Sequence, residues 1–351
     1  MEDPRPAQPP APPTVIVQPR ESMFGRFGKF LLIALAICVF ALMGTAASVQ
    51  QYYGDGTGPT EKYYSLSKTA TDKIALVNIS GAIMEGSDYV EEQLDRIAED
   101  ESVVAAVLWI DSPGGTVTKS NRIYHHAKRV FEQREIPCVV SMGSLCASGG
   151  YYVAMAVGDQ ADAIYAEPTT WTGSIGVVIP HYNFSRMMGL LGVNDQSIVS
   201  GDLKLMGSPT RRMEDSEREV LQTLVNESFD SFKQIVKSGR PAFRDDEAAL
   251  DAVATGQVFT AQQALEKGLV DKIGYLEDAI ERAAELAGVS TDDVRCVEYN
   301  KRVTPIEQLL AARTPAGGGS SQTLDVRSLI ELSTPKAYYV YTLLPTMLEG
   351  N

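Results

Sequence analysis

The sequence predicts an α/β protein with a parallel sheet, preceded by an apolar N-terminal helix. Short apolar runs of strand length alternate with segments of helical spacing between about residues 73 and 157. The order is strand, glycine turn, helix, strand, serine turn, helix, which favours parallel strands with helices packed outside. In addition, residues 30–49 carry no charge and are long enough for a helix of roughly 30 Å, one bilayer core.

The composition is that of a globular protein. The chain has 351 residues, 44% of them hydrophobic and 22% charged, which allows one large domain or two smaller ones. The formal net charge of −14 argues against a nucleic-acid partner. The four cysteines show no CxxC spacing and form no Cys/His cluster, so we expect neither a metal site nor a cofactor, and buried free thiols rather than disulfides.

The amino terminus has the pattern of a membrane anchor. Residues 1–29 are predicted to be a Pro-rich cytoplasmic tail, 30–49 a transmembrane helix and 50–72 a linker. Arg20, Arg26 and Lys29 precede the apolar run and no basic residue follows it closely, so the positive-inside rule places the rest of the chain outside the cytoplasm. A cleaved signal peptide is the alternative. The long leader and the full-length apolar run favour the anchor.

The main domain is expected over residues 73–300, and its first elements form the predicted sheet. Strands are expected at 73–81, 103–110 and 136–142, with helices at 89–100 and 119–133. The turns that follow the second and third strands lie at the carboxyl ends of strands, where open α/β sheets build their sites.

The second half of the chain is predicted to be mainly helical. The expected elements are a strand at 163–166, a helix at 183–191, a strand at 196–200, a loop at 201–209, a long amphipathic helix at 214–239, and helices at 243–254, 260–267 and 276–287. Residues 301–351 form a C-terminal extension with a flexible break near 314–322. Its apolar segment 337–344 could add a strand or dock on a partner.

One turn has the features of a nucleophile site. Residues 146–152 (Cys-Ala-Ser-Gly-Gly-Tyr-Tyr) present Ser148 immediately before the apolar run 153–157. Backbone N–H groups at the start of a helix suit a developing oxyanion. Gly114-Gly115 in the preceding turn and Gly149 beside the serine could converge to supply such groups. An ordinary tight turn is the alternative at both places.

A serine nucleophile needs a base. His125 and His126 fall within a predicted helix and His181 follows a strand, and none lies in a special setting. Lys204, in a loop of small and apolar residues, is the better candidate. It can act as a base only if burial lowers its pKa toward neutrality. A solvated loop lysine is the alternative.

Four motifs together resemble a known family. DSPGG (111–115), MGSLCASGGYYVAMA (142–156), TGSIGV (172–177) and SGDLKLMGSP (200–209) are similar, in the same order, to the motifs of the S49 family of membrane-anchored serine peptidases, the signal peptide peptidase A group. The resemblance spans roughly residues 73–290. Cys146 departs from it, since alanine is more usual there, but a free cysteine behaves as a small hydrophobe.

The resemblance assigns a role to each matching residue. It implies that Ser148 is the nucleophile and Lys204 the general base. Gly114, Gly115 and Gly149 match the oxyanion positions, and Ser174 matches a serine that orients the lysine.

The resemblance also implies a ClpP/crotonase-like fold and a homo-oligomer, octameric for the short form, whose sites are shared between subunits. The expected location is the bacterial inner membrane, with a single membrane pass and an extracytoplasmic catalytic domain. The expected substrates are cleaved signal peptides and other unfolded apolar segments. Three alternatives stay open: an acyl-CoA-binding crotonase-type enzyme, a non-catalytic membrane scaffold, and a stomatin-linked membrane serine protease of the same clan.

Overall fold

The computed structural model describes residues 23–53, 58–301 and 337–340. The chain forms two compact units, residues 1–57 and 58–351. In the first unit the described residues form one helix, α1 (Met23–Tyr53). Its segment Phe27–Thr45 is long and apolar enough to cross a membrane, with a mean hydropathy of 2.3 and no burial inside the protein. The predicted apolar helix is present, although it begins before residue 30 and ends after residue 49.

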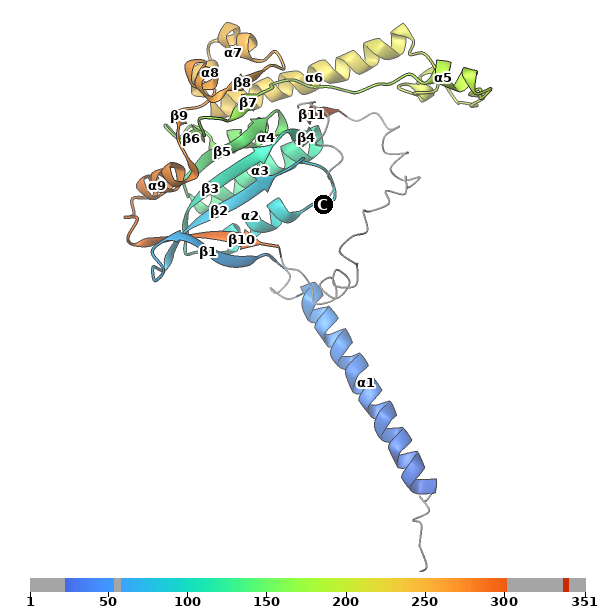
Figure 1. The fold of residues 1–351 in the computed structure, drawn as a ribbon, viewed down its shortest axis with the longest axis vertical. Helices are drawn as coiled ribbons and strands as arrows, with labels where there is room; N and C mark the ends of the chain where they lie inside the picture. The colour runs from blue at the N-terminus through green and yellow to red at the C-terminus, as the bar shows by residue number, and fades with distance from the viewer. Residues whose placement is uncertain (1–22, 54–57, 302–336, 341–351) are drawn as a thin grey trace, which may run out of the picture. The chain divides into compact units, whose positions relative to one another are not determined.

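The second unit is built on a nine-stranded sheet in its described residues, in the order β1-β10-β2-β3-β5-β6-β9, with β7 beside β5 and β8 beside β7 (Figure 1). The strands are β1 (Thr60–Leu66), β2 (Asp72–Ser80), β3 (Val103–Ser112), β5 (Cys138–Ala147), β6 (Ile164–Ala166), β7 (Trp171–Gly173), β8 (Val258–Thr260), β9 (Lys272–Ile273) and β10 (Val294–Asn300). Pairing is parallel except between β1 and β10 and between β7 and β8. The predicted parallel α/β sheet is therefore confirmed.

Helices cover both faces of this sheet. The helices of this unit are α2 (Tyr89–Glu99), α3 (Val117–Arg134), α4 (Gly149–Ala154), α5 (Ser185–Leu190), α6 (Asp215–Gly239), α7 (Glu247–Val253), α8 (Ala261–Glu266) and α9 (Leu276–Ala287), and of these α5 lies away from the sheet. Short 3-10 turns lie at η1 (Met155–Val157), η2 (Asp202–Leu205) and η3 (Pro241–Phe243). In β3, Ala106 and Leu108 belong to the core shared with α2, α3 and α4, whereas Ala105 and Val107 belong to the core under α9. A strand buried on both faces explains the continuous apolar run.

Several segments differ from the sequence prediction. Strands β7, β8, β9 and β10 were not predicted. Residues 60–66, expected in a linker, form β1. This strand was missed because it is a mostly exposed edge strand that carries Glu61 and Lys62 rather than an apolar pattern. Residues 196–200 form no strand, because Ile198 is fully exposed and has no neighbouring strand to pair with. The helix predicted at 243–254 is shorter in the structure, where α7 spans Glu247–Val253 and follows the 3-10 turn η3.

The extension also contains ordered structure. Tyr338–Val340 forms β11, which pairs with β4 (Gly114–Thr116). Of the two alternatives for segment 337–344, an added strand or docking on a partner, the structure shows a strand at 338–340. Residues 314–322, predicted as a flexible break, lie outside the described residues.

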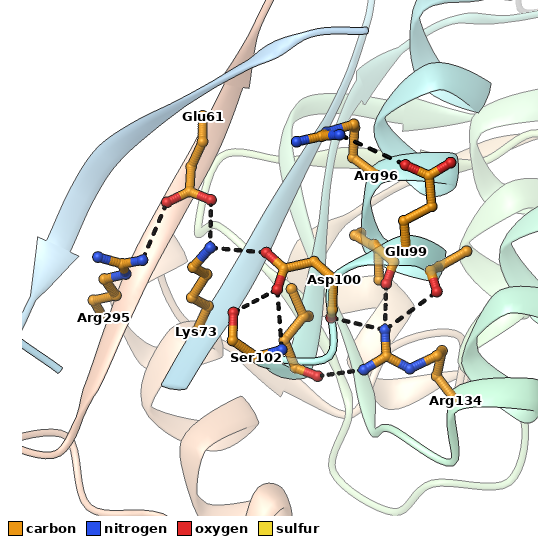
Figure 2. A network of polar contacts seen from close by, with 11 residues as sticks. Glu61, Lys73, Arg96, Glu99, Asp100, Ser102, Arg134 and Arg295 are labelled. Carbon is orange, nitrogen blue, oxygen red and sulfur yellow. Dashed lines mark hydrogen bonds and ion pairs between the residues drawn. The ribbon is translucent and has the colours of Figure 1, made fainter. Parts of the chain in front are cut away.

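A polar network lies at the amino ends of β2 and β3 (Figure 2). Lys73 Nζ contacts Glu61 at 2.7 Å and Asp100 at 2.8 Å, and Ser102 donates its backbone N–H to Asp100 at 3.0 Å. Burial works to raise the pKa of Asp100, but the hydrogen bonds from Lys73 and Ser102 outweigh it and lower the pKa to about 2. The network therefore fixes the end of the sheet opposite the two predicted glycine and serine turns.

Residues 179–213, which we call the arm, extend between β7 and α6. They carry α5 and η2, and Figure 1 shows α5 at the far end of α6. The arm exposes large apolar side chains: Tyr182, Phe184, Met187, Leu190, Leu191, Val193, Ile198 and Leu203. A series of exposed apolar side chains this long is typical of a surface that binds a partner.

Candidate active site

Ser148 occupies a sharp turn between β5 and α4. Its backbone has φ 55° and ψ −112°, a conformation that non-glycine residues adopt only when their surroundings enforce it. Two hydrogen bonds do so here: Ser148 N–H donates to the Gly173 carbonyl at 2.8 Å, and Tyr152 N–H donates to the Ser148 carbonyl at 2.8 Å. The Ser148 side chain is fully buried, and its Oγ has no hydrogen-bond partner among the described residues. A strained, unpartnered serine at the carboxyl end of a central strand is placed as a nucleophile would be.

The two glycine turns meet beside this serine. A β-carbon added to Gly114, where φ is +93°, would lie 2.5 Å from the Gly149 nitrogen. A β-carbon added to Gly149 would lie 3.0 Å from the Gly115 nitrogen. The absence of side chains at these three positions lets the backbone N–H groups of Gly115 and Gly149 approach one small volume next to Ser148. The structure brings the predicted oxyanion glycines together; their role stays a prediction.

Strand β4 is held on one edge by Ile83. Ile83 N–H donates to the Gly114 carbonyl and Thr116 N–H donates to the Ile83 carbonyl, both at 2.9 Å. The segment that carries Ile83 is itself tied to the start of α3: Thr116 Oγ1 donates to Glu85 at 2.8 Å, and the buried Lys119 contacts Asp88 at 2.8 Å. These contacts fix the backbone that presents the Gly115 N–H group.

Ser174 lies next to Ser148 because their strands are paired. Strand β7 runs parallel to the end of β5, with Gly173 opposite Ala147, so the residues that follow both strands are neighbours. Ser174 is 5% exposed, has φ 53°, and donates its N–H to the Gln257 carbonyl at 2.7 Å. Cys146 is fully buried in β5, as expected for a small hydrophobe.

Lys204 is not part of this cluster. It lies on η2 in the arm and is exposed, and within the described residues no contact joins it to Ser148 or Ser174. The two histidines of α3 make contacts elsewhere. His126 contacts Asp95 at 2.9 Å, and the His125 ring packs on Tyr124. The single chain thus assembles the serine and glycines but leaves the predicted lysine outside.

The free edge of β4 is occupied by the chain's own β11. Tyr338, Tyr339 and Val340 pair antiparallel with Thr116, Gly115 and Gly114, respectively. On its other side, Tyr338 exchanges backbone hydrogen bonds with Val178, at 2.9 and 3.0 Å. An extended tripeptide therefore lies between two backbone edges, with main-chain hydrogen bonds on both, as peptides do when they are recognised by strand addition.

The side chain of Tyr339 fills an aromatic pocket beside the site. Its ring stacks on Tyr152, with centroids 5.1 Å apart and an interplanar angle of 23°, and lies 4.6 Å from the Phe232 ring. Its hydroxyl donates to the Ser228 carbonyl at 2.8 Å. Sequence reasoning missed this pocket and the Ile83 clamp. Tyr152, four residues after Ser148, was the one local signal, whereas Phe232 comes from a distant helix.

Comparisons with known proteins bear on this site. Residues 130–290 match the family described as Peptidase family S49. The chain is 39% identical over 231 residues to the Synechocystis sp. protein named "Putative protease slr0021", and the match covers 65% of this chain and 79% of that protein. It is 31% identical to the Arabidopsis thaliana protein named "Serine protease SPPA, chloroplastic", over 72% of this chain and 38% of the relative.

Two further comparisons are with a bacterial relative and with a solved structure. Identity to Protease 4 of Haemophilus influenzae is 31%, over 63% of this chain and 36% of that protein. The chain thus spans less than two-fifths of the plant and Haemophilus relatives. A solved structure, 1510-N membrane-bound stomatin-specific protease, aligns with 17% identity and a TM-score of 0.39 over 65% of this chain and 98% of that chain.

The Synechocystis relative matches along most of its length, and the family match covers the Ser148 turn, α4 and the arm. The described fold is the α/β class predicted from the sequence. This chain belongs to peptidase family S49.

Proposed function

We propose that this chain is a membrane-anchored serine endopeptidase in which Ser148 is the nucleophile and Lys204 the general base. One observation carries the proposal: an extended peptide segment, β11, lies across the glycine strand β4 beside a buried serine whose Oγ has no partner. A peptide bound in this way presents its carbonyl groups to backbone N–H donors next to the nucleophile.

The reaction is acyl transfer in two steps. Neutral Lys204 Nζ takes the proton from Ser148 Oγ, and Oγ forms a bond to the peptide carbonyl carbon. The N–H groups of Gly115 and Gly149 stabilise the oxyanion. Lys204 then gives its proton to the leaving amine as the C–N bond breaks, and water hydrolyses the acyl-enzyme. Removing one oxyanion donor costs about 3 kcal/mol in known cases. Ser174, whose strand β7 pairs with the end of β5, is the residue that we propose to orient the lysine amine.

The base comes from a second copy of the chain in this proposal. Two features support it: Lys204 is exposed on the arm, and the arm displays apolar side chains such as Leu190 and Ile198, 81% and 100% exposed. Docking the arm of one subunit onto the body of the next would bury this surface and bring Lys204 to Ser148. Burial would also lower the pKa of the lysine toward neutrality. We propose a closed homo-oligomer, because a head-to-tail interface of this kind generates a ring when the rotation closes. The family resemblance implies that this ring is an octamer.

The proposed setting is the bacterial inner membrane. Helix α1 is the single anchor, with the N-terminus in the cytoplasm and the catalytic unit outside, in accordance with the basic residues before the span. Substrates are cleaved signal peptides and other unfolded apolar segments near the membrane. Only an extended chain can pair with β4 and Val178, which favours unfolded substrates over folded ones.

Hydrolysis of a fluorogenic apolar peptide by the full chain in detergent tests this proposal. We expect Ser148→Ala and Lys204→Ala to be inactive, and the control Lys267→Ala, which alters an exposed lysine elsewhere, to be fully active. An equimolar mixture of the two inactive proteins, allowed to exchange subunits, should regain about a quarter of wild-type activity, because random assembly makes about one site in four intact.

The other outcomes are equally informative. An active Lys204→Ala protein would show that another group is the base. An inactive mixture, with subunit exchange verified by labelled chains, would show that serine and lysine act within one subunit. If the wild-type protein did not react with a fluorophosphonate probe, the assignment of Ser148 as the nucleophile would be wrong. Binding of acyl-CoA would favour a crotonase-type enzyme.

A further inference from the structure

The part of the arm that carries Lys204 is closed by the side chain of Asp195, which lies outside the site described above. One carboxylate oxygen of Asp195 accepts hydrogen bonds from the backbone N–H of Ser197 at 2.9 Å and from its hydroxyl at 2.5 Å. The other oxygen accepts a hydrogen bond from the hydroxyl of Thr210, 15 positions further along the chain. We call these three hydrogen bonds the clip. The clip closes residues 195–210 into a loop, with Lys204 inside it on η2.

Thr210 is a fixed end of this loop. The residue before it, Pro209, accepts a hydrogen bond from the Phe184 N–H at 2.7 Å. The residue after it, Arg211, donates to Glu217 at 3.2 Å, and the Glu217 side chain is 2% exposed at the start of α6. The backbone at Thr210 is therefore held both to the first part of the arm and to α6. A side chain that binds Thr210 is attached to a rigid point.

Short turns connect the clip to Lys204. Met206 N–H donates to a carbonyl of η2 at 3.0 Å, so the chain turns directly after the lysine. Ser208 N–H donates to the last carbonyl of η2 at 2.9 Å, and Ser208 Oγ lies 2.7 Å from Thr210 Oγ1. A continuous series of hydrogen bonds therefore joins the turn that presents Lys204 to the clip.

We propose that Asp195 is a positioning residue for the general base: it holds the Lys204 turn in one conformation before the arm docks on a second copy. The proposal rests on the proposed function and adds a residue on which that function depends. A loop that is ordered in advance loses less conformational entropy when it docks. A base that is held in place also avoids the rate loss of about 10²-fold that a displacement of about 1 Å can cause. Asp195 acts through Lys204 and not on the substrate.

The clip is stable over the pH range of a hydrolysis assay. The hydrogen bonds from Ser197 and Thr210 lower the pKa of the Asp195 carboxyl to about 2. The carboxylate is therefore ionised near neutral pH, and an ionised carboxylate is an acceptor only, as its three donors require. A change in the pH profile of activity near neutrality does not come from titration of Asp195.

Three variants of the full chain test the clip by hydrolysis of the fluorogenic apolar peptide in detergent. Asp195→Ala removes all three hydrogen bonds, Thr210→Val removes one, and Asp195→Asn keeps an acceptor for Ser197. We expect kcat to fall about 20-fold in Asp195→Ala, about tenfold in Thr210→Val and about threefold in Asp195→Asn, with KM changed by less than about twofold. The double variant Asp195→Ala/Thr210→Val should lose no more kcat than Asp195→Ala, because both changes remove the same interaction.

Asn183→Ala is the matched control. The side-chain oxygen of Asn183 makes the same local turn, since it accepts hydrogen bonds from the backbone N–H of Ser185 at 2.9 Å and from its hydroxyl at 2.7 Å. These contacts reach only two positions along the chain and do not enclose Lys204. The kcat of Asn183→Ala should therefore stay within about twofold of the wild-type value.

Two measurements separate positioning of the base from a general loss of structure. The acid limb of the kcat/KM profile reports the ionisation of the base, and in Asp195→Ala it should move to higher pH by about one unit, because an amine that is less firmly seated keeps more of its water. Hydrogen exchange of the backbone amides at 203–208 should be about tenfold faster in Asp195→Ala than in Asn183→Ala. The far-UV circular dichroism and the size of the assembly should be the same in all variants.

The outcomes distinguish this proposal from the proposed function. Wild-type kcat in Asp195→Ala, with or without faster exchange at 203–208, would overturn the role of Asp195 and leave the peptidase intact. An additive loss in the double variant, or a smaller assembly in Asp195→Ala, would also overturn it, because Asp195 would then act elsewhere than on the Lys204 turn. An active Lys204→Ala protein, or no hydrolysis by the wild-type protein, would overturn the proposed function and the role of Asp195 with it.

Discussion

Replacing Gly115 by alanine tests whether β4 must stay where Ile83 and Gly149 hold it. A β-carbon at Gly115 would lie 1.8 Å from the Ile83 carbonyl oxygen and 2.8 Å from its Cα. These are backbone atoms, so no side-chain rotation can relieve the overlap. Because the φ of Gly115 is not positive, alanine is tolerated by the local backbone, and the only obstacle is space.

The cost follows from what must move. To bring the 1.8 Å distance to an ordinary contact, β4 and the Ile83 segment must separate by about 1.5 Å, since packed interiors leave no free volume for the methyl group. The two hydrogen bonds between them, both 2.9 Å long, are then weakened. At about 1 kcal/mol each, stability falls by about 2 kcal/mol. The Gly115 N–H group is displaced by a similar distance from the oxyanion position, which should lower kcat by about 10²- to 10³-fold.

The assay compares peptide hydrolysis and thermal unfolding of Gly115→Ala with those of Gly28→Ala. The control makes the same change on α1, outside the catalytic unit, where no atom lies within 4 Å of the added carbon. We expect Gly115→Ala to lose about 5 °C in Tm and most of its kcat, with KM less affected, and the control to change in neither respect. Wild-type kcat in a folded Gly115→Ala protein would refute the oxyanion role of this residue.

Three further predictions concern charge and burial. The pKa of Asp100 is about 2 in the fold, below its usual 3.8. Its carboxylate therefore stabilises the protein at neutral pH, and this effect is lost as the pH falls from about 4 to 2. Asp100→Asn should lower the free energy of unfolding by about 2 kcal/mol at pH 7, and denaturant titrations should show a weaker dependence of stability on pH between 4 and 2. Lys119→Met should lower the free energy of unfolding by about 3 kcal/mol, because the 2%-exposed Lys119 side chain pairs with Glu91 at 2.6 Å. The double variant Lys119→Met/Glu91→Gln should recover much of this stability. Equal stability of the single and double variants would contradict a buried ion pair. Burial raises the pKa of the Cys296 thiol to about 12. Iodoacetamide should therefore leave this thiol and the buried Cys138 and Cys146 unmodified in the native protein but alkylate all three after unfolding, as measured by mass spectrometry. Alkylation of any of them in the native protein would show that the thiol is accessible.

Local sequence pattern was enough to predict the central strands of the sheet, β2, β3, β5 and β6. The runs at 73–81 and 103–110 are apolar because their strands are buried on both faces. Burial on both faces selects apolar side chains at successive positions, so these strands are recognisable from the sequence. The Ser148 turn could be found for a similar reason. A serine held at φ 55° before a helix needs glycines beside it, and these stand next to it in the sequence.

Strand β1 and residues 196–200 were predicted wrongly because their own sequences do not indicate whether they pair with a neighbouring strand. Strand β1 pairs through its backbone at the edge of the sheet, so its polar side chains gave no periodic signal. The 196–200 segment has the composition of a strand but no neighbour to pair with, and pairing is a property of the fold rather than of the segment.

The sequence by itself determined the apolar helix, the parallel α/β class and the candidates Ser148, Lys204 and the glycines. Only the tertiary structure decided which of them meet: strand pairing sets Ser174 beside Ser148, backbone contact brings Gly114 and Gly115 to Gly149, and Lys204 stays on the arm. It also placed Tyr339 against Phe232, residues 107 positions apart by their numbers. Spacing along the chain encodes neighbours within a strand or helix, whereas contacts across elements arise from packing and backbone hydrogen bonds that the one-dimensional pattern does not contain.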